Sequence, residues 1–203
     1  MRIVAAYTLA TLAQERRAPI IETVVTTINP DGTVNCGAMG VEWGEERIVI
    51  KPFPGTRTLR NLRATGAAVV NLTDDILLFS QAALDDPHPP TLPAAGVAGA
   101  VLDDACSWRE VRVEAIDDGA QRAVVSTVVV GRGGGREFLG FNRARHAVLE
   151  ASILASRAHL LPVAEIRSEL DRLQVLVDKT AGPREREAMA YVTDHLRAAV
   201  GEP

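Results

Sequence analysis

The pattern of apolar and polar positions changes character about two thirds of the way along the chain. Up to residue 141, apolar and β-branched runs alternate with turn residues, which is typical of strands. Beyond residue 142, apolar residues recur every three or four positions, which is typical of amphipathic helices. We therefore expect a strand-rich domain over residues 1–141 and a small helical subdomain over residues 142–203. The predicted strands cover residues 20–28, 33–43, 47–51, 67–72, 108–116 and 123–130, enough for a small barrel.

Three helices are predicted in the second part of the chain. Asn142, Pro162 and Pro183 stand at positions that favour helix starts, and Gly182 favours a stop. Each helix carries an apolar stripe, so we expect these helices to pack against a core rather than to hold a cofactor. The predicted helices cover residues 143–161, 163–179 and 184–200.

Three other stretches lack a clear periodic pattern. Residues 76–100 contain a proline-rich stretch and are predicted to form a long loop, with His88 either solvent-exposed or part of a lid. The glycine-rich residues 131–136 are predicted to form a flexible hairpin turn. The apolar residues 3–13 are too short to span a bilayer, so we expect a helix or strand that packs on the barrel.

The segment after the third predicted strand has the composition of an anion site. Pro52 and Pro54 end the strand because proline cannot donate to a ladder, and residues 56–64 then follow a helical pattern. A helix start carries unpaired N–H groups and partial positive charge, which suits a phosphate monoester. Alternatively, Thr56 merely caps the helix and its arginines form a solvated face. The side chains gathered here are Lys51, Thr56, Arg57, Thr58 and Asn61.

Composition and charge narrow the class of protein. The chain has 203 residues, 47% of them hydrophobic and 24% charged, which is ordinary for a globular protein. Its net charge of −4 and its 4% of aromatic residues disfavour a nucleic-acid partner. Cys36 and Cys106 form no C-x-x-C pair, and the four histidines lack metal-ligand spacing, so no metal is expected. We expect reduced thiols, a cytoplasmic location and no membrane partner.

The order strand, turn, strand, strand, helix, strand resembles the FMN-binding split-barrel proteins, which include flavin reductase-like and pyridoxamine phosphate oxidase-like branches. More narrowly, the segments ETVVTTINPDGTVNCGAMGV, KPFPGTRTLRNLRATG, VVNLTDD and GFNRARHAVLEASILASRAHLL look like those of the DUF447 family of two-part flavoproteins. The resemblance covers nearly the whole chain. It implies an α+β, mainly β fold, namely an FMN-binding split β-barrel followed by a helical subdomain, and a homodimer with flavin near the interface.

The resemblance also implies which residues contact FMN. The phosphate would lie at the strand-to-helix turn, and the isoalloxazine ring along the neighbouring strand, where small residues let the backbone approach. Two residues have plainer alternatives, because Asn35 can bond to backbone and Met39 can belong to the core. The implied phosphate ligands are Lys51, Thr56, Arg57, Thr58 and Asn61; the residues beside the ring are Asn35, Cys36, Gly37, Ala38 and Met39; Asn71 and Thr73 complete the polar contacts.

A second polar group marks the start of the helical subdomain. Asn142, Arg145 and His146 are candidate substrate contacts there. The pattern favours a simpler interpretation, in which Asn142 caps the helix and the basic residues form a surface cluster.

The chain has no recognisable nucleophile or triad, and hydride transfer through a flavin needs neither. We therefore expect an FMN-dependent oxidoreductase that exchanges electrons with a small-molecule donor or acceptor. Two alternatives stay open: a flavin carrier without turnover, and a split-barrel interaction module that has lost flavin.

Overall fold

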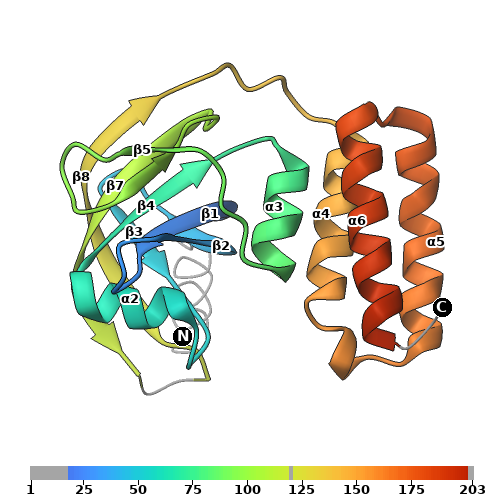
Figure 1. The fold of residues 1–203 in the computed structure, drawn as a ribbon, viewed down its shortest axis with the longest axis horizontal. Helices are drawn as coiled ribbons and strands as arrows, with labels where there is room; N and C mark the ends of the chain where they lie inside the picture. Colours follow the sequence, from blue (N-terminus) through green and yellow to red (C-terminus); the bar gives the residue numbers. More distant parts are fainter. Residues whose placement is uncertain (1–17, 119–120, 201–203) are drawn as a thin grey trace, which may run out of the picture.

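Six antiparallel strands form a barrel in this computed structural model, which describes residues 18–118 and 121–200 (Figure 1). The prediction for residues 3–13 lies outside the described residues. The neighbours around the barrel are β1, β2, β3, β8, β7 and β4. The predicted split-barrel fold with C-terminal helices is therefore confirmed. The strands are β1 (Ile20–Ile28), β2 (Val34–Trp43), β3 (Arg47–Ile50), β4 (Ala67–Leu72), β7 (Ser107–Asp117) and β8 (Val124–Gly134).

The strand β2 is paired unequally on its two sides. It forms a hairpin with β1 along nearly its whole length, from the pair Ile28 and Val34 to the pair Ile20 and Glu42. Its register with β3 covers only Val41–Trp43. Among the described residues, residues 34–40 of β2 are therefore paired on the β1 side alone, and the barrel closes between β2 and β3 only through Val41–Trp43.

The helix α2 (Arg57–Thr65) closes one end of the barrel (Figure 1). Leu59 and Leu62 are at most 2% exposed and pack with the strand residues of the barrel interior. The helix ends at Gly66, whose φ of 65° lies in the left-handed region that favours glycine. The short helix predicted here is therefore confirmed.

The predicted loop over residues 76–100 is wrong in two places. Asp75 caps a helix, α3 (Ile76–Leu84), by accepting from the N–H groups of Leu77 and Leu78. Apolar residues lie all around this helix, so it shows no amphipathic period; it packs between the barrel and the later helices. Beyond it, β5 (Thr91–Pro93) and β6 (Ala100–Leu102) form a small two-stranded sheet.

The glycine-rich stretch 131–136 is not the predicted hairpin turn. β8 continues to Gly134, and its Gly133 is paired with Trp108 of β7. A side chain at Gly133 would overlap the Trp108 indole, so glycine is needed for the ring to lie on the strand. The turn between β7 and β8 lies earlier, between Asp117 and Val124.

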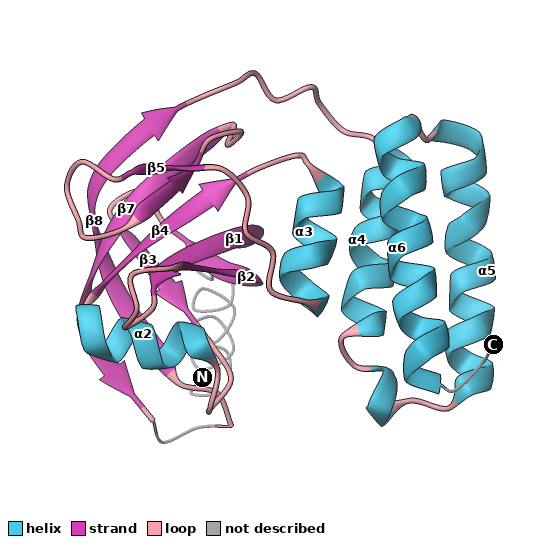
Figure 2. Ribbon diagram, in the orientation of Figure 1, coloured by secondary structure: helices cyan, strands magenta, loops and turns pink. Residues whose placement is uncertain are grey.

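The helical subdomain packs beside the barrel, with α3 between the strands and the other helices (Figure 2). The helix predicted over residues 143–161 ends at Ala155, and a 3-10 turn follows. No helix within the described ranges is both long and apolar enough to cross a membrane. The elements are α4 (Arg143–Ala155), η1 (Ala158–Leu160), α5 (Val163–Thr180) and α6 (Pro183–Val200).

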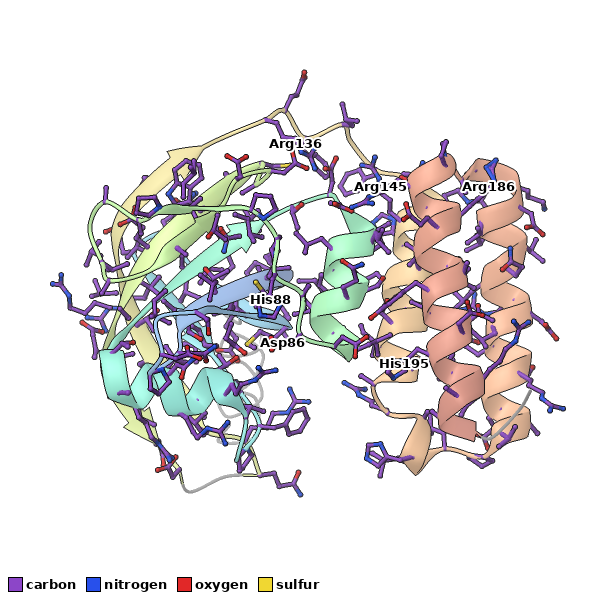
Figure 3. All side chains as sticks on the ribbon, in the orientation of Figure 1. Asp86, His88, Arg136, Arg145, Arg186 and His195 are labelled. Atoms are coloured by element: carbon purple, nitrogen blue, oxygen red, sulfur yellow. The ribbon has the colours of Figure 1, made fainter. Side chains whose placement is uncertain are left out.

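A group of charged side chains joins the two parts of the chain (Figure 3). The Asp74 carboxylate is only 3% exposed and accepts from the guanidinium groups of Arg136 and, at 2.7 Å, Arg145. Arg145 also donates to Glu185 of α6 at 2.9 Å. Burial alone would raise the pKa of Asp74. Hydrogen bonds from Arg136 and from the N–H of Leu139, together with the positive charges of Arg136 and Arg145, outweigh burial and lower that pKa.

We expect Asp74→Asn to lower the free energy of unfolding by about 3 kcal/mol, because it removes one partner of a buried ion pair. Asp104→Asn is the matched control, since Asp104 also pairs with Arg136 but is 64% exposed. Chemical denaturation measures the free energy of unfolding of both variants. Equal effects of the two substitutions would contradict the role of Asp74.

The same carboxylate sets a pH dependence. Because the folded pKa of Asp74 is lowered, its contribution to stability is present above the unfolded pKa and is lost as pH falls through the folded pKa. Between about pH 5 and pH 3, the wild-type unfolding free energy should therefore fall more steeply than that of Asp74→Asn.

Candidate cofactor-binding site

The turn before α2 presents the start of the helix to solvent. Gly55 has a φ of 80°, in the left-handed region, and open space where a side chain would lie. Thr56 then caps the helix: its hydroxyl accepts from the N–H of Leu59 at 3.4 Å and donates to the carbonyl of Phe53 at 2.8 Å. The first N–H groups of a helix lack partners within it, and Arg57 beside them is exposed. An anion is the natural ligand of such a turn.

Buried hydrogen bonds hold α2 against the first two strands. The Asn35 amide of β2 donates to the Thr58 hydroxyl at 3.1 Å and to the Thr27 hydroxyl at 3.1 Å. The Asn61 amide donates to Thr27 at 3.0 Å and to the side chain of Asn29 at 2.8 Å. Asn35, Thr58 and Asn61 are at most 4% exposed. The structure thus brings these three predicted residues together as a rigid support for the turn.

Residues 34–40 of β2 lie beside this support. A Cβ atom added to Gly37 would lie 2.9 Å from the Thr58 hydroxyl oxygen and 3.1 Å from Met39 Cε, so glycine lets strand and helix approach. Gly37, Ala38 and Met39 are half-buried in the stretch that has no register with β3. Backbone groups on that side of β2 have no partner in β3.

The two predicted phosphate-binding cations each have a carboxylate partner. Lys51 forms an ion pair with Glu42 of β2. Arg57 forms one with Asp86, which follows α3 in the chain. Both pairs are partly exposed, so they contribute little stability, and an anion at the turn can compete for either cation.

Burial governs the chemistry of Cys36. The side chain belongs to the core shared with α3, and burial, followed by the charge of Asp86, raises its pKa to about 11. The thiol therefore stays protonated near neutral pH and is a poor nucleophile. Within the part of the chain that the structure describes, no three His, Cys, Asp or Glu side chains come together to hold a metal ion.

The structure gives the side chains of Asn71 and Thr73 hydrogen-bond partners near the end of β4. The Asn71 amide donates to the carbonyl of Val24 at 3.0 Å, and its oxygen accepts from the N–H of Leu102 at 3.0 Å. The Thr73 hydroxyl accepts from the N–H of Asp75 at 3.0 Å, just before α3. Both side chains organise the end of β4.

The candidate substrate residues have structural partners as well. Asn142 caps α4, as the pattern favoured, by accepting from the N–H of Arg145 at 3.1 Å. Arg145 is not part of a solvated surface cluster, because it lies between Asp74 and Glu185. The His146 ring stacks on Phe141, with ring centroids 5.9 Å apart.

Sequence reasoning missed three residues around the turn: Thr27, Asn29 and Asp86. Thr27 lies near the end of β1 and Asn29 begins the turn that follows, where they look like ordinary strand and turn residues. Asp86 follows a helix that the pattern did not reveal. Only the paired hydroxyls Thr26 and Thr27, on a strand otherwise rich in apolar residues, signalled buried polar contacts.

Comparison with known proteins places this barrel in the class of split-barrel proteins. A structure of an FMN-bound protein from Methanosarcina mazei matches 88% of this chain and 96% of its own, at 23% identity and a TM-score of 0.77. A flavoredoxin from Methanosarcina acetivorans matches 60% of this chain and 72% of its own, at 11% identity and a TM-score of 0.50. At these identities the likeness shows the fold.

The family follows from the sequence itself. The N-terminal domain model of the protein family of unknown function DUF447 matches residues 21–134, and the second DUF447 model matches residues 142–194. The chain belongs to the DUF447 family, as does the Methanosarcina mazei protein. The predicted family is confirmed.

We expect Gly37→Ala to lower the free energy of unfolding by about 1–3 kcal/mol, because the new methyl group overpacks the contact between β2 and Thr58. Gly134→Ala is the control: it is also a strand glycine, with nothing within 4 Å of an added Cβ. Urea unfolding of both variants measures the difference. If Gly37→Ala were as mild as the control, the close approach of strand and helix would be refuted.

Proposed function

We propose that the protein binds FMN, with the phosphate at the start of α2 and the isoalloxazine ring along residues 34–40 of β2. One observation carries the proposal: the Asn35 to Thr58 hydrogen bond holds an exposed helix start beside a stretch of β2 that has no register with β3. An anion site and a flat backbone surface at one place suit a phosphorylated, planar cofactor. The FMN in the Methanosarcina mazei family member supports the choice of flavin.

The phosphate would be held by the exposed groups of the turn. Arg57 offers a guanidinium that matches phosphate oxygens, and Thr56 and the first backbone N–H groups add donors. Lys51 adds a point charge from the end of β3. Asp86 and Glu42 hold these cations in place until the phosphate competes for them. Thr58 and Asn61, both buried, fix the position of the turn and border the phosphate.

The ring would lie against the small residues of β2, where Gly37 and Ala38 leave the backbone accessible. Bound FMN supplies hydride and single-electron chemistry, and the protein holds the ring and controls access to it. Because Cys36 stays protonated and buried, it takes no covalent part. The proposed activity is therefore that of an oxidoreductase acting on a small molecule.

The proposal includes a homodimer. The segment that joins the barrel to α4 exposes three large apolar side chains: Phe138 is 51% exposed, Leu139 73% and Phe141 90%. Neighbouring exposed apolar groups of this size are typical of surfaces that contact another protein. A second copy would cover them, and would bring two flavin sites into one assembly.

The FMN proposal predicts a selective effect of Arg57→Met. The affinity of this variant for FMN should fall about tenfold to a hundredfold, the worth of one charge-assisted hydrogen bond. Its affinity for riboflavin should stay unchanged, because riboflavin lacks the phosphate. Arg63→Met is the control, because Arg63 lies on the same helix in an exposed ion pair with Asp118. Flavin fluorescence titration measures all three proteins.

Two results would overturn this proposal. A protein that is colourless and ignores added FMN has no flavin site. Equal affinity of the wild type for FMN and riboflavin would mean that the turn does not bind phosphate.

The oxidoreductase proposal predicts that NADH or NADPH bleaches the yellow FMN-loaded protein under anaerobic conditions, faster than it bleaches free FMN. A carrier would hold flavin with no such acceleration. Stopped-flow absorbance with each nucleotide separates the two, and bleaching at the rate of free FMN with both would argue against an enzyme that takes electrons from nicotinamides.

A further inference from the structure

A cavity of about 370 Å³ lies where the barrel meets the helical subdomain. Leu78 and Gln81 of α3 form one wall, residues 85–89 form a second, and Tyr191 of α6 forms a third. Both DUF447 domains thus contribute to it. Its volume is in the range of small-molecule pockets.

Asp86 connects the cavity to the turn before α2. This carboxylate lines the cavity and also forms the ion pair with Arg57. Figure 3 shows Asp86 and His88 on the segment that follows α3, on the side of the barrel. A molecule that contacts Asp86 in the cavity would therefore share this residue with Arg57 of the proposed phosphate site.

The lining combines apolar surfaces with acceptors. Leu78, Pro87 and Pro89 offer flat apolar contacts, whereas Asp85 and Asp86 bring negative charge. Asp86 gives one oxygen to Arg57, and carboxylate oxygens can only accept hydrogen bonds, so the lining favours a ligand that brings N–H donors.

Tyr191 holds one of these carboxylates in place. Its hydroxyl donates to Asp85 across the cavity wall, from α6 to the end of α3. Burial, and then the contact with Asp85, raise the pKa of Tyr191 to about 12, so the phenol stays protonated and donates to Asp85. A phosphorylated or carboxylated ligand would meet two carboxylates and is disfavoured.

We propose that this cavity binds a small, planar organic cation, an amidinium or guanidinium, between its apolar walls and its carboxylates. The binding itself does not depend on FMN.

The test uses benzamidinium and benzoate, which share shape and size but have opposite charges. Each is titrated into isotope-labelled full-length protein at equal ionic strength, and amide chemical shifts report both affinity and place. We expect benzamidinium to shift the resonances of Gln81, His88 and Tyr191, and benzoate to leave them unchanged. Equal binding of both probes, or shifts elsewhere only, would overturn the proposal.

Two substitutions should change the affinity for benzamidinium in opposite directions. Asp85→Asn should weaken benzamidinium binding about fivefold, the worth of a partly exposed charge pair, whereas Tyr191→Phe should strengthen it about twofold by freeing the Asp85 carboxylate. Asp194→Asn, an exposed carboxylate on α6, is the control and should change nothing. Unchanged affinity in Asp85→Asn would overturn the assignment.

Failure here is distinguishable from failure of the flavin proposal. Asp85 and Tyr191 contact each other rather than α2, so both variants should bind FMN as the wild type does. A protein that binds benzamidinium but not FMN would refute the flavin site alone. A protein that binds FMN but not benzamidinium would refute only the ligand proposed for the cavity.

Discussion

The position of α2 depends on one buried cluster of amides and hydroxyls. Asn35, Thr58 and Asn61 are almost inaccessible to water, so each polar group needs a partner inside the protein. Thr27 accepts from both amides, and this ties β1, β2 and α2 to one register. A shift of the helix by one residue would leave several of these groups unpaired. The exposed start of the helix and residues 34–40 of β2 are held together for this reason.

A second constraint joins the barrel to the helices. Val24 and Cys36 on the outer side of β1 and β2 pack in one core with α3, α4 and α6, and the Asp74 cluster closes the same boundary with charge. Because α3 lies between strands and helices, its end reaches α6 through Asp85 and α2 through Asp86. The helical subdomain thus takes part in the surroundings of the candidate site.

Local pattern predicted most of the fold, and its failures have a common cause. Apolar and β-branched runs located all six barrel strands, and the helical pattern of residues 56–64 located α2. The helix α3 was missed because apolar residues lie all around it, so it shows no amphipathic period. The end of β8 was missed because its glycines serve the Trp108 ring, a contact between strands that local pattern does not contain.

The sequence by itself determined the positions of the six barrel strands, the helix start with its hydroxyls and cations, the DUF447 family and hence the split barrel. Only the tertiary structure decided which of those groups are accessible. Thr58 and Asn61 became supports, Lys51 and Arg57 acquired carboxylate partners, and Arg145 was placed between Asp74 and Glu185, which are 71 and 40 residues away in the chain. The physical reason is that burial and charge pairing are set by residues distant in sequence, whereas strand and helix patterns arise from neighbours.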